Sequence, residues 1–120
     1  MKKIETFENA ITNQCKDLIK AGIEPTVFWA YRNAMRNGNE HLDFSDVIWD
    51  EDIQAIADAL AENGITEFTI SSTFSGLIKT LVEFEKRGFK IAATTEVNAT
   101  YKDWQTGEFA KIPALLMQRV

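Results

Sequence analysis

The sequence contains one cysteine, one histidine and no apolar run long enough to cross a bilayer. A single cysteine cannot form an internal disulfide, and one cysteine with one histidine cannot supply a structural zinc site. The longest apolar run of the second half, "IPALLM" at 112–117, is far shorter than a membrane span. The N-terminus turns polar and acidic after its lysines, unlike a secretory signal. These absences predict a cytoplasmic protein without membrane contact, disulfide or bound metal.

Basic residues are absent from the middle third of the chain. Residues 1–36 carry six basic and four acidic residues, and residues 79–120 carry seven and five, so each segment has a net charge of +2. Residues 37–78 contain no Lys or Arg, and their nine acids bring the total to −5. Nucleic-acid-binding proteins carry a basic stripe, so binding of a nucleic-acid backbone through this acidic face is not expected. The nine acids are Glu40, Asp43, Asp46, Asp50, Glu51, Asp52, Asp58, Glu62 and Glu67.

An acidic face of this kind favours contact with another protein, whose identity the sequence does not give. Glu51, Asp58 and Glu62 fall along one side of a predicted helix and are predicted partner-contact residues. Trp104 is the fourth, because it lies at a predicted hairpin tip and tryptophan is enriched at interface hot spots. A more specific hypothesis is that the acidic face imitates a nucleic acid and so occupies a DNA-binding protein. The spacing argues against it, because the three acids along the helix do not form a dense, phosphate-like track of charge.

Apolar periodicity predicts an α/β fold within a single domain, residues 1–120. The order ααβαβαββ indicates a small four-stranded mixed sheet, with a parallel core, a C-terminal antiparallel hairpin and helices packed on it. Residues 1–38 are expected to form a helical pair and residues 41–120 a βαβαββ unit. Helices are predicted at 4–21, 25–37, 49–64 and 72–88, and strands at 41–48, 66–71, 89–101 and 109–117.

Pro113 lies inside the last predicted strand. Because proline cannot donate a hydrogen bond to a neighbouring strand, the C-terminal strand is predicted to lie at an edge of the sheet. An uncovered edge strand can pair with a second copy of the chain. This predicts two alternatives: a homodimer through the C-terminal edge strand, or cover of that strand by the N-terminal helices.

Three polar segments are predicted to meet at one edge of the sheet. Ligands gather beyond the carboxyl ends of parallel strands, where Trp49 and Asp50 follow the first strand and residues 71–76 follow the second. Residues 94–96 are a weaker third member, within or after the third strand. The predicted ligand-binding residues are Ser71, Ser72, Thr73, Ser75, Gly76, Trp49 and Asp50.

The serine-rich segment also has a purely structural interpretation. One hydroxyl of residues 71–73 is expected to cap the following helix. Gly76 is predicted to lie in the first turn of that helix, where glycine costs about 1 kcal/mol relative to alanine. Its backbone is therefore expected to be closely approached by a neighbouring element or by a ligand, and packing is the commoner cause.

Several chemistries are excluded for this edge. Asp50 and its two acidic neighbours oppose a bound phosphate, and the glycine-rich nucleotide motifs are absent. His41 is predicted at the opposite end of the sheet from Ser71, about 20 Å away, which excludes a serine–histidine pair. No catalytic residue, metal ligand or cofactor is assigned, and an enzyme is not the favoured interpretation.

Three blocks of sequence carry a resemblance to a known family. "DFSDVIW", "FTISSTFSGLIKTL" and "YKDWQTGE…IPALLM" resemble, in this order, small uncharacterised proteins of Gram-positive bacteria, and the similarity spans residues 26–117. Members of that family are often encoded on conjugative transposons or related mobile elements. The family has no assigned activity, so the resemblance implies an intracellular accessory protein and transfers no site residue.

Two functions follow as hypotheses. The first is an accessory protein of a mobile element that acts through protein–protein contacts with its acidic middle face. The alternative is a small-molecule-binding α/β domain whose site lies around 71–76 at the carboxyl edge of the strands.

Overall fold

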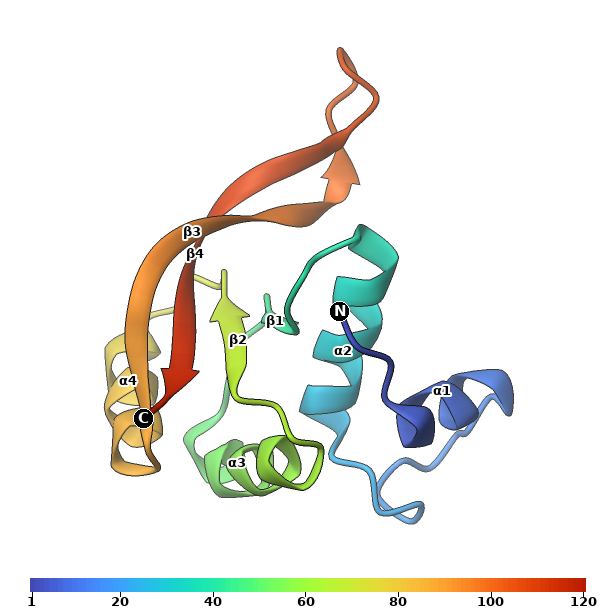
Figure 1. Ribbon diagram of the computed structural model, residues 1–120, viewed down its shortest axis with the longest axis vertical. Helices are drawn as coiled ribbons and strands as arrows, with labels where there is room; N and C mark the ends of the chain where they lie inside the picture. The colour runs from blue at the N-terminus through green and yellow to red at the C-terminus, as the bar shows by residue number, and fades with distance from the viewer.

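A four-stranded mixed sheet lies at the centre of the structure, a computed structural model that describes residues 1–120. Helices lie beside and beneath the sheet, and its last two strands extend past it as a long curved hairpin (Figure 1). The elements, in chain order, are α1 (Glu5–Thr12), α2 (Pro25–Asn37), β1 (Asp43–Phe44), the 3₁₀ turn η1 (Asp50–Asp52), α3 (Ile53–Glu62), β2 (Glu67–Ile70), α4 (Leu77–Lys86), β3 (Phe89–Lys102) and β4 (Phe109–Arg119).

The strand order is β1-β2-β4-β3. β1 pairs in parallel with β2, whereas β4 pairs antiparallel with both β2 and β3. β2 and β3 therefore run in the same direction, as two strand–helix–strand crossovers require, but β4 lies between them. The predicted α/β fold with a mixed sheet is confirmed, and its parallel core consists of the single pair β1–β2.

The prediction that the C-terminal strand lies at an edge of the sheet is wrong. Residues 115–118 of β4 pair with β2 on one side, while β4 pairs with β3 on the other. Pro113 lies opposite Glu96 of β3 and beyond the last residue that pairs with β2. The proline is tolerated because β4 has only one neighbour at that point. The outer strands are β1 and β3.

Helix α1 is shorter than predicted because it ends at Thr12. Gln14 adopts a positive φ of 51°, and the N–H of Cys15 donates to the carbonyl of Ala10, as in a Schellman cap. Ile19, which falls inside the predicted helix 4–21 but beyond the end of α1, is consequently 75% exposed. None of the helices combines the length and the apolar character that a membrane crossing needs.

α1 packs on α2. The ring of Phe7 meets Tyr31 edge-on at 5.2 Å, and the Tyr31 hydroxyl donates to Glu8 Oε1 at 2.7 Å and accepts from the N–H of Ile4 at 3.1 Å. These contacts place α1 on the side of α2 away from α4 (Figure 1).

Phe68 of β2 lies at the centre of the core and has no exposed surface. Its ring lies 5.3, 5.1 and 5.2 Å from the rings of Phe44, Phe84 and Phe89. One side chain therefore joins β1, β2, α4 and β3 through aromatic contacts.

The hairpin of β3 and β4 is fastened to the end of α2. The N–H of Asn98 donates to Asn39 Oδ1 at 2.8 Å, and Asn39 Nδ2 donates to the carbonyl of Asn98 at 3.1 Å. Asn98 Nδ2 also donates to the carbonyl of Asn37 at 2.8 Å. Asparagine side chains thus hold β3 to the end of α2 at a residue that also pairs with Lys111 of β4, and the hairpin curves over α2 (Figure 1).

We expect Phe68→Ala to lower the free energy of unfolding by about 3–5 kcal/mol, because it leaves a cavity among three other aromatic rings. Urea denaturation followed by circular dichroism measures the change. Ile78→Ala is the matched control, since Ile78 is 78% exposed on α4 and should change stability by about 0.5 kcal/mol or less. Similar losses for the two variants would contradict the assigned core.

Candidate functional site

The structure brings the predicted tryptophan–acid and serine-rich segments to the same edge of the sheet. The N–H groups of Ser71 and Ser72 both donate to the carbonyl of Phe44, at 3.1 and 3.3 Å, where β1 ends. Two donors on one carbonyl end the ladder, so β1 spans two residues where 41–48 was predicted. Asp50 forms an ion pair of 2.9 Å with Lys79 of α4, which ties the start of η1 to the helix that follows the serines.

Residues 94–96 lie exposed within β3, which continues to Lys102. Thr94 and Ile70 both pair with Leu115 of β4, so the segment lies level with the end of β2 but is separated from it by β4.

The expected cap of α4 by a hydroxyl of residues 71–73 is wrong. The helix begins at Leu77, its N-cap is Gly76, and no side chain caps it. Ser71 instead donates to Asp43, and the buried Ser72 Oγ has no partner. Thr73 and Ser75 are exposed.

Gly76 lies before α4 and not within its first turn, and its φ of −88° is open to any residue. A Cβ atom at this position would lie 3.3 Å from Cε2 of Phe74. The element that approaches the glycine is therefore the ring of its own turn, so the glycine does not indicate a ligand. None of the five main cavities is lined by residues 71–76 or by Asp50.

The predicted partner-contact residues fall into two separate places. Glu51, Asp58 and Glu62 are exposed on η1 and α3, and Asp58 accepts from Gln54 at 3.0 Å. Trp104 is 88% exposed at the tip of the hairpin, at the other end of the molecule from α3 (Figure 1). One compact partner surface cannot include all four.

A groove along one side of α2 is formed by two cavities of about 230 and 280 Å³. The two cavities share Asn33, Asp43, Ser45 and Asp46, so they adjoin each other. We call them together the α2 groove. Its walls are α2, the segment 43–49 and, at the far end, residues 98–101 of the hairpin.

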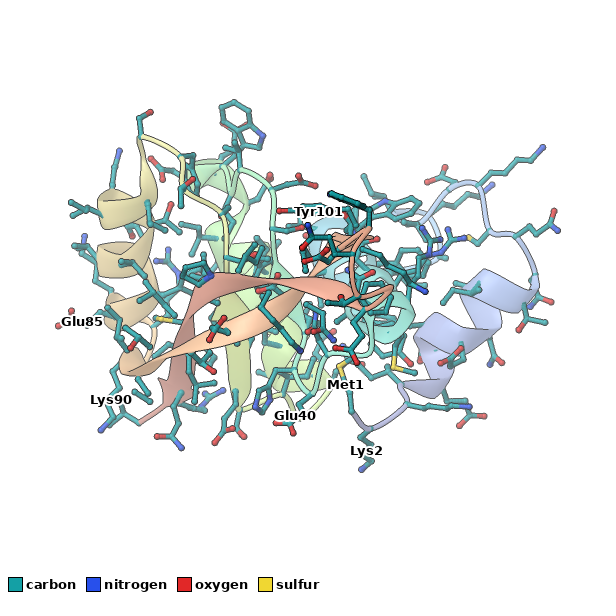
Figure 2. All side chains as sticks on the ribbon, turned by 90° about the horizontal axis from the view of Figure 1, so that it is seen from above. Met1, Lys2, Glu40, Glu85, Lys90 and Tyr101 are labelled. Atoms are coloured by element: carbon teal, nitrogen blue, oxygen red, sulfur yellow. The ribbon has the colours of Figure 1, made fainter.

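Three exposed aromatic residues line the α2 groove. Trp29 of α2 is 47% exposed and Trp49 is 63% exposed, and both belong to the first cavity. Tyr101 lies on the hairpin, which extends over α2 (Figure 2), and lines the second cavity. No Lys or Arg lines either cavity, whereas Asp43 and Asp46 line both.

Asp43 is a buried carboxylate that is held by hydroxyl groups alone. Its Oδ1 accepts from Thr69 Oγ1 at 2.6 Å, and its Oδ2 accepts from Ser71 Oγ at 2.7 Å. No Lys, Arg or His forms an ion pair with it. Loss of water raises the pKa of Asp43 above its usual value, although the two hydroxyl donors act in the opposite direction. A buried acid with a raised pKa beside a cavity is typical of a functional site.

The arrangement favours binding over covalent chemistry. His41, two residues before β1, has its Nε2 3.7 Å from Oε2 of Glu67, whereas Ser71 follows the carboxyl end of β2. The chain's histidine and the serine-rich segment therefore lie at opposite ends of the parallel pair, as predicted. No three side chains of His, Cys, Asp or Glu lie close enough together to hold a metal ion.

Sequence reasoning placed Asp43 and Asp46 in the acidic third but assigned neither to a site, and it gave Trp29 no role. One signal was available: Asp43 is an acid in the middle of the alternating strand "HLDFS". An acid there requires partners on the neighbouring strand if it is buried. For Trp29 the chain offers no such signal.

We expect Asp43→Asn to be as stable as the wild type or more stable at pH 7–8. The raised pKa means that the folded protein binds this proton more tightly than the unfolded chain, whose value is about 3.9. The contribution of Asp43 is thus fully present below pH about 4 and is lost as the pH rises through the folded-state pKa. Asparagine keeps the hydrogen-bonding shape and removes the charge.

Urea denaturation between pH 4 and pH 8 measures this difference, which should shrink toward pH 4. Asp58→Asn, at an exposed acid, is the control and should show no such trend. A variant at Asp43 that is clearly less stable than the wild type at pH 7.5 would refute the account of a costly buried charge.

Comparison with known proteins gives a family without an activity. A family model described as Domain of unknown function (DUF7698) matches residues 26–119. No curated protein and no solved structure matches the chain. The match begins in the first turn of α2 and ends with β4, so it includes the whole sheet and nearly all of the α2 groove. The expected relation to an uncharacterised family is confirmed: the chain belongs to the DUF7698 family.

Proposed function

We propose that the protein is a non-enzymatic accessory protein that binds a positively charged partner protein through its acidic middle third. The observation that carries this proposal is the charge of residues 37–78, which include nine acids and no Lys or Arg. Glu40, Asp46, Asp50, Glu51, Asp58 and Glu62 are exposed. Of these, only Asp50 has a basic partner within the chain, Lys79. The other five are free to attract and orient a basic surface.

The α2 groove supports the same proposal. Tryptophan and tyrosine dominate the binding energy of protein interfaces, and the groove is lined by two exposed tryptophans and one exposed tyrosine. Two carboxylates accompany them without any basic residue. Such a surface suits a partner segment that carries both positive charge and apolar groups.

The cellular setting is part of the proposal. The resemblance of residues 26–117 to proteins of Gram-positive bacteria supports a role as an accessory protein of a conjugative transposon or a related mobile element. The single cysteine supports a cytoplasmic location. A homodimer formed through strands would not use residues 115–118 of β4, which are already paired on both sides, and would use one of the outer strands, β1 or β3.

The alternative of a small-molecule site around 71–76 has less support. Ser71 is already bonded to Asp43, and Gly76 is approached by its own Phe74. The buried Ser72 Oγ without a partner is the one observation that favours it.

Affinity capture from a bacterial lysate tests the proposal. The triple variant Glu51→Gln, Asp58→Gln, Glu62→Gln removes charge from η1 and α3 and should retain less of any basic protein that the wild type captures. The matched control, Glu5→Gln, Glu85→Gln, Glu108→Gln, removes the same charge at exposed acids outside residues 37–78. Retention should also fall with added salt.

Identical captured proteins for the wild type and the triple variant would refute the proposal. Equal losses for the triple variant and its control would also refute it, because the effect would then follow net charge and not the acidic third.

A further inference from the structure

The first cavity of the α2 groove is a small pocket with a tryptophan on each wall. One wall is α2, which supplies Trp29, and the other is the segment 43–49, which supplies Trp49. The lining residues Ala30 and Asp43 are nearly fully buried and form the floor, whereas both tryptophans are exposed at the rim. At about 230 Å³ the pocket is smaller than the roughly 300–1,000 Å³ of drug-sized sites. It suits a single side chain.

The ring of Trp29 already takes part in a cation–π contact. The guanidinium carbon of Arg32 lies 5.3 Å from the centre of that ring. Arg32 and Trp29 line a different cavity together with Phe28, and Arg32 does not line the pocket that contains Trp49. The pocket side of Trp29 is therefore not used by Arg32. Indole is the best of the aromatic rings for such a contact.

Asp43 gives the floor of the pocket its charge. It is 6% exposed, and its two oxygens accept only from neutral hydroxyls. A buried carboxylate without a positive partner bears a desolvation cost that a cation beside it would offset. Asp46 adds a second, exposed carboxylate to the lining. An anion or a second carboxylate would be repelled here.

We propose that the pocket between Trp29 and Trp49 binds one positively charged side chain, an arginine or a lysine, of a partner protein. The cation lies between aromatic faces and above the Asp43 carboxylate, whose free lone pairs accept its N–H donors. This inference rests on the proposed function in one respect: the cation is taken to come from a partner protein. Binding by the pocket itself is measured separately.

The experiment uses the ¹⁵N-labelled full chain and two probes of the same shape. N-acetyl-arginine methylamide carries the charge, and the matching citrulline compound replaces one guanidinium nitrogen by a neutral oxygen. The protein has three tryptophans, whose indole N–H signals are assigned by single Trp→Phe variants. We expect a saturable shift of the Trp29 and Trp49 signals with the arginine probe, and no shift of Trp104, which lies at the hairpin tip.

Two pairs of variants sharpen the result. Asp43→Asn should weaken binding of the arginine probe about tenfold or more, as for loss of a hydrogen bond to a charged group, whereas Glu85→Gln, at an exposed acid of α4, should not. Trp49→Ala should weaken it, whereas Trp104→Ala should not. Trp49 is 63% exposed, so its variant keeps the test available even where Asp43→Asn alters folding.

The inference is overturned by the absence of a saturable shift at Trp29 and Trp49, or by equal binding of the citrulline probe. Arginine binding that survives both Asp43→Asn and Trp49→Ala would also overturn it. None of these results changes the outcome expected in the lysate experiment, which tests the proposed function separately. Loss of basic partners in the α3 triple variant together with an inert pocket would retain the proposed function and remove only the pocket.

Discussion

The pairing of β1 with β2 is the constraint on which the rest of the structure depends. It consists of two residue pairs, Asp43 with Thr69 and Phe44 with Ile70. On one face Phe44 meets the Phe68 ring and joins the core. On the other, Asp43 accepts from Thr69 and Ser71. So short a ladder gives little stability by itself, and the side chains on its two faces therefore fix the register. The same register places Asp43 on the floor of the α2 groove.

The other half of the groove depends on the hairpin. β3 and β4 extend far beyond β2, and a free two-stranded ribbon is only marginally stable in water. Asn98 anchors it through Asn39 and the carbonyl of Asn37, and Lys111 of β4 donates to the Asn98 side chain. Residues 98–101 are thereby held against the end of α2, where Tyr101 lines the groove. The aromatic wall of the second cavity thus depends on a few side-chain amides.

Local sequence patterns predicted which helices and strands form. Long-range contacts, which no local pattern contains, determine where β4 lies in the sheet and which side chains meet. Apolar spacing was enough for α2, α3 and the hairpin, because each pattern is contained in its own segment. The predicted ends of α1 and α4 were wrong. α1 stops before the positive φ of Gln14, and α4 begins at Leu77, after a turn in which the Leu77 N–H donates to the carbonyl of Phe74. The predicted edge position of β4 was wrong because Pro113 indicates a missing neighbour at one residue alone. β4 has one neighbouring strand at Pro113 but two over residues 115–118. Asp43 and Ser71 are 28 residues apart, and no local pattern joins them.

Asp43 illustrates how stability and binding can oppose each other within one residue. In the isolated chain its charge is costly, because burial removes water and supplies only neutral donors. Asparagine would fill the same volume and make comparable hydrogen bonds without that cost. An aspartate at this position is therefore not explained by the stability of the fold. It is explained if a cation binds in the groove, because the charge that lowers the stability of the free protein then raises the affinity of the complex. Cation binding also explains why residues 37–78 contain no Lys or Arg. A basic side chain in this segment could pair with Asp43 and occupy the position that the partner's cation needs.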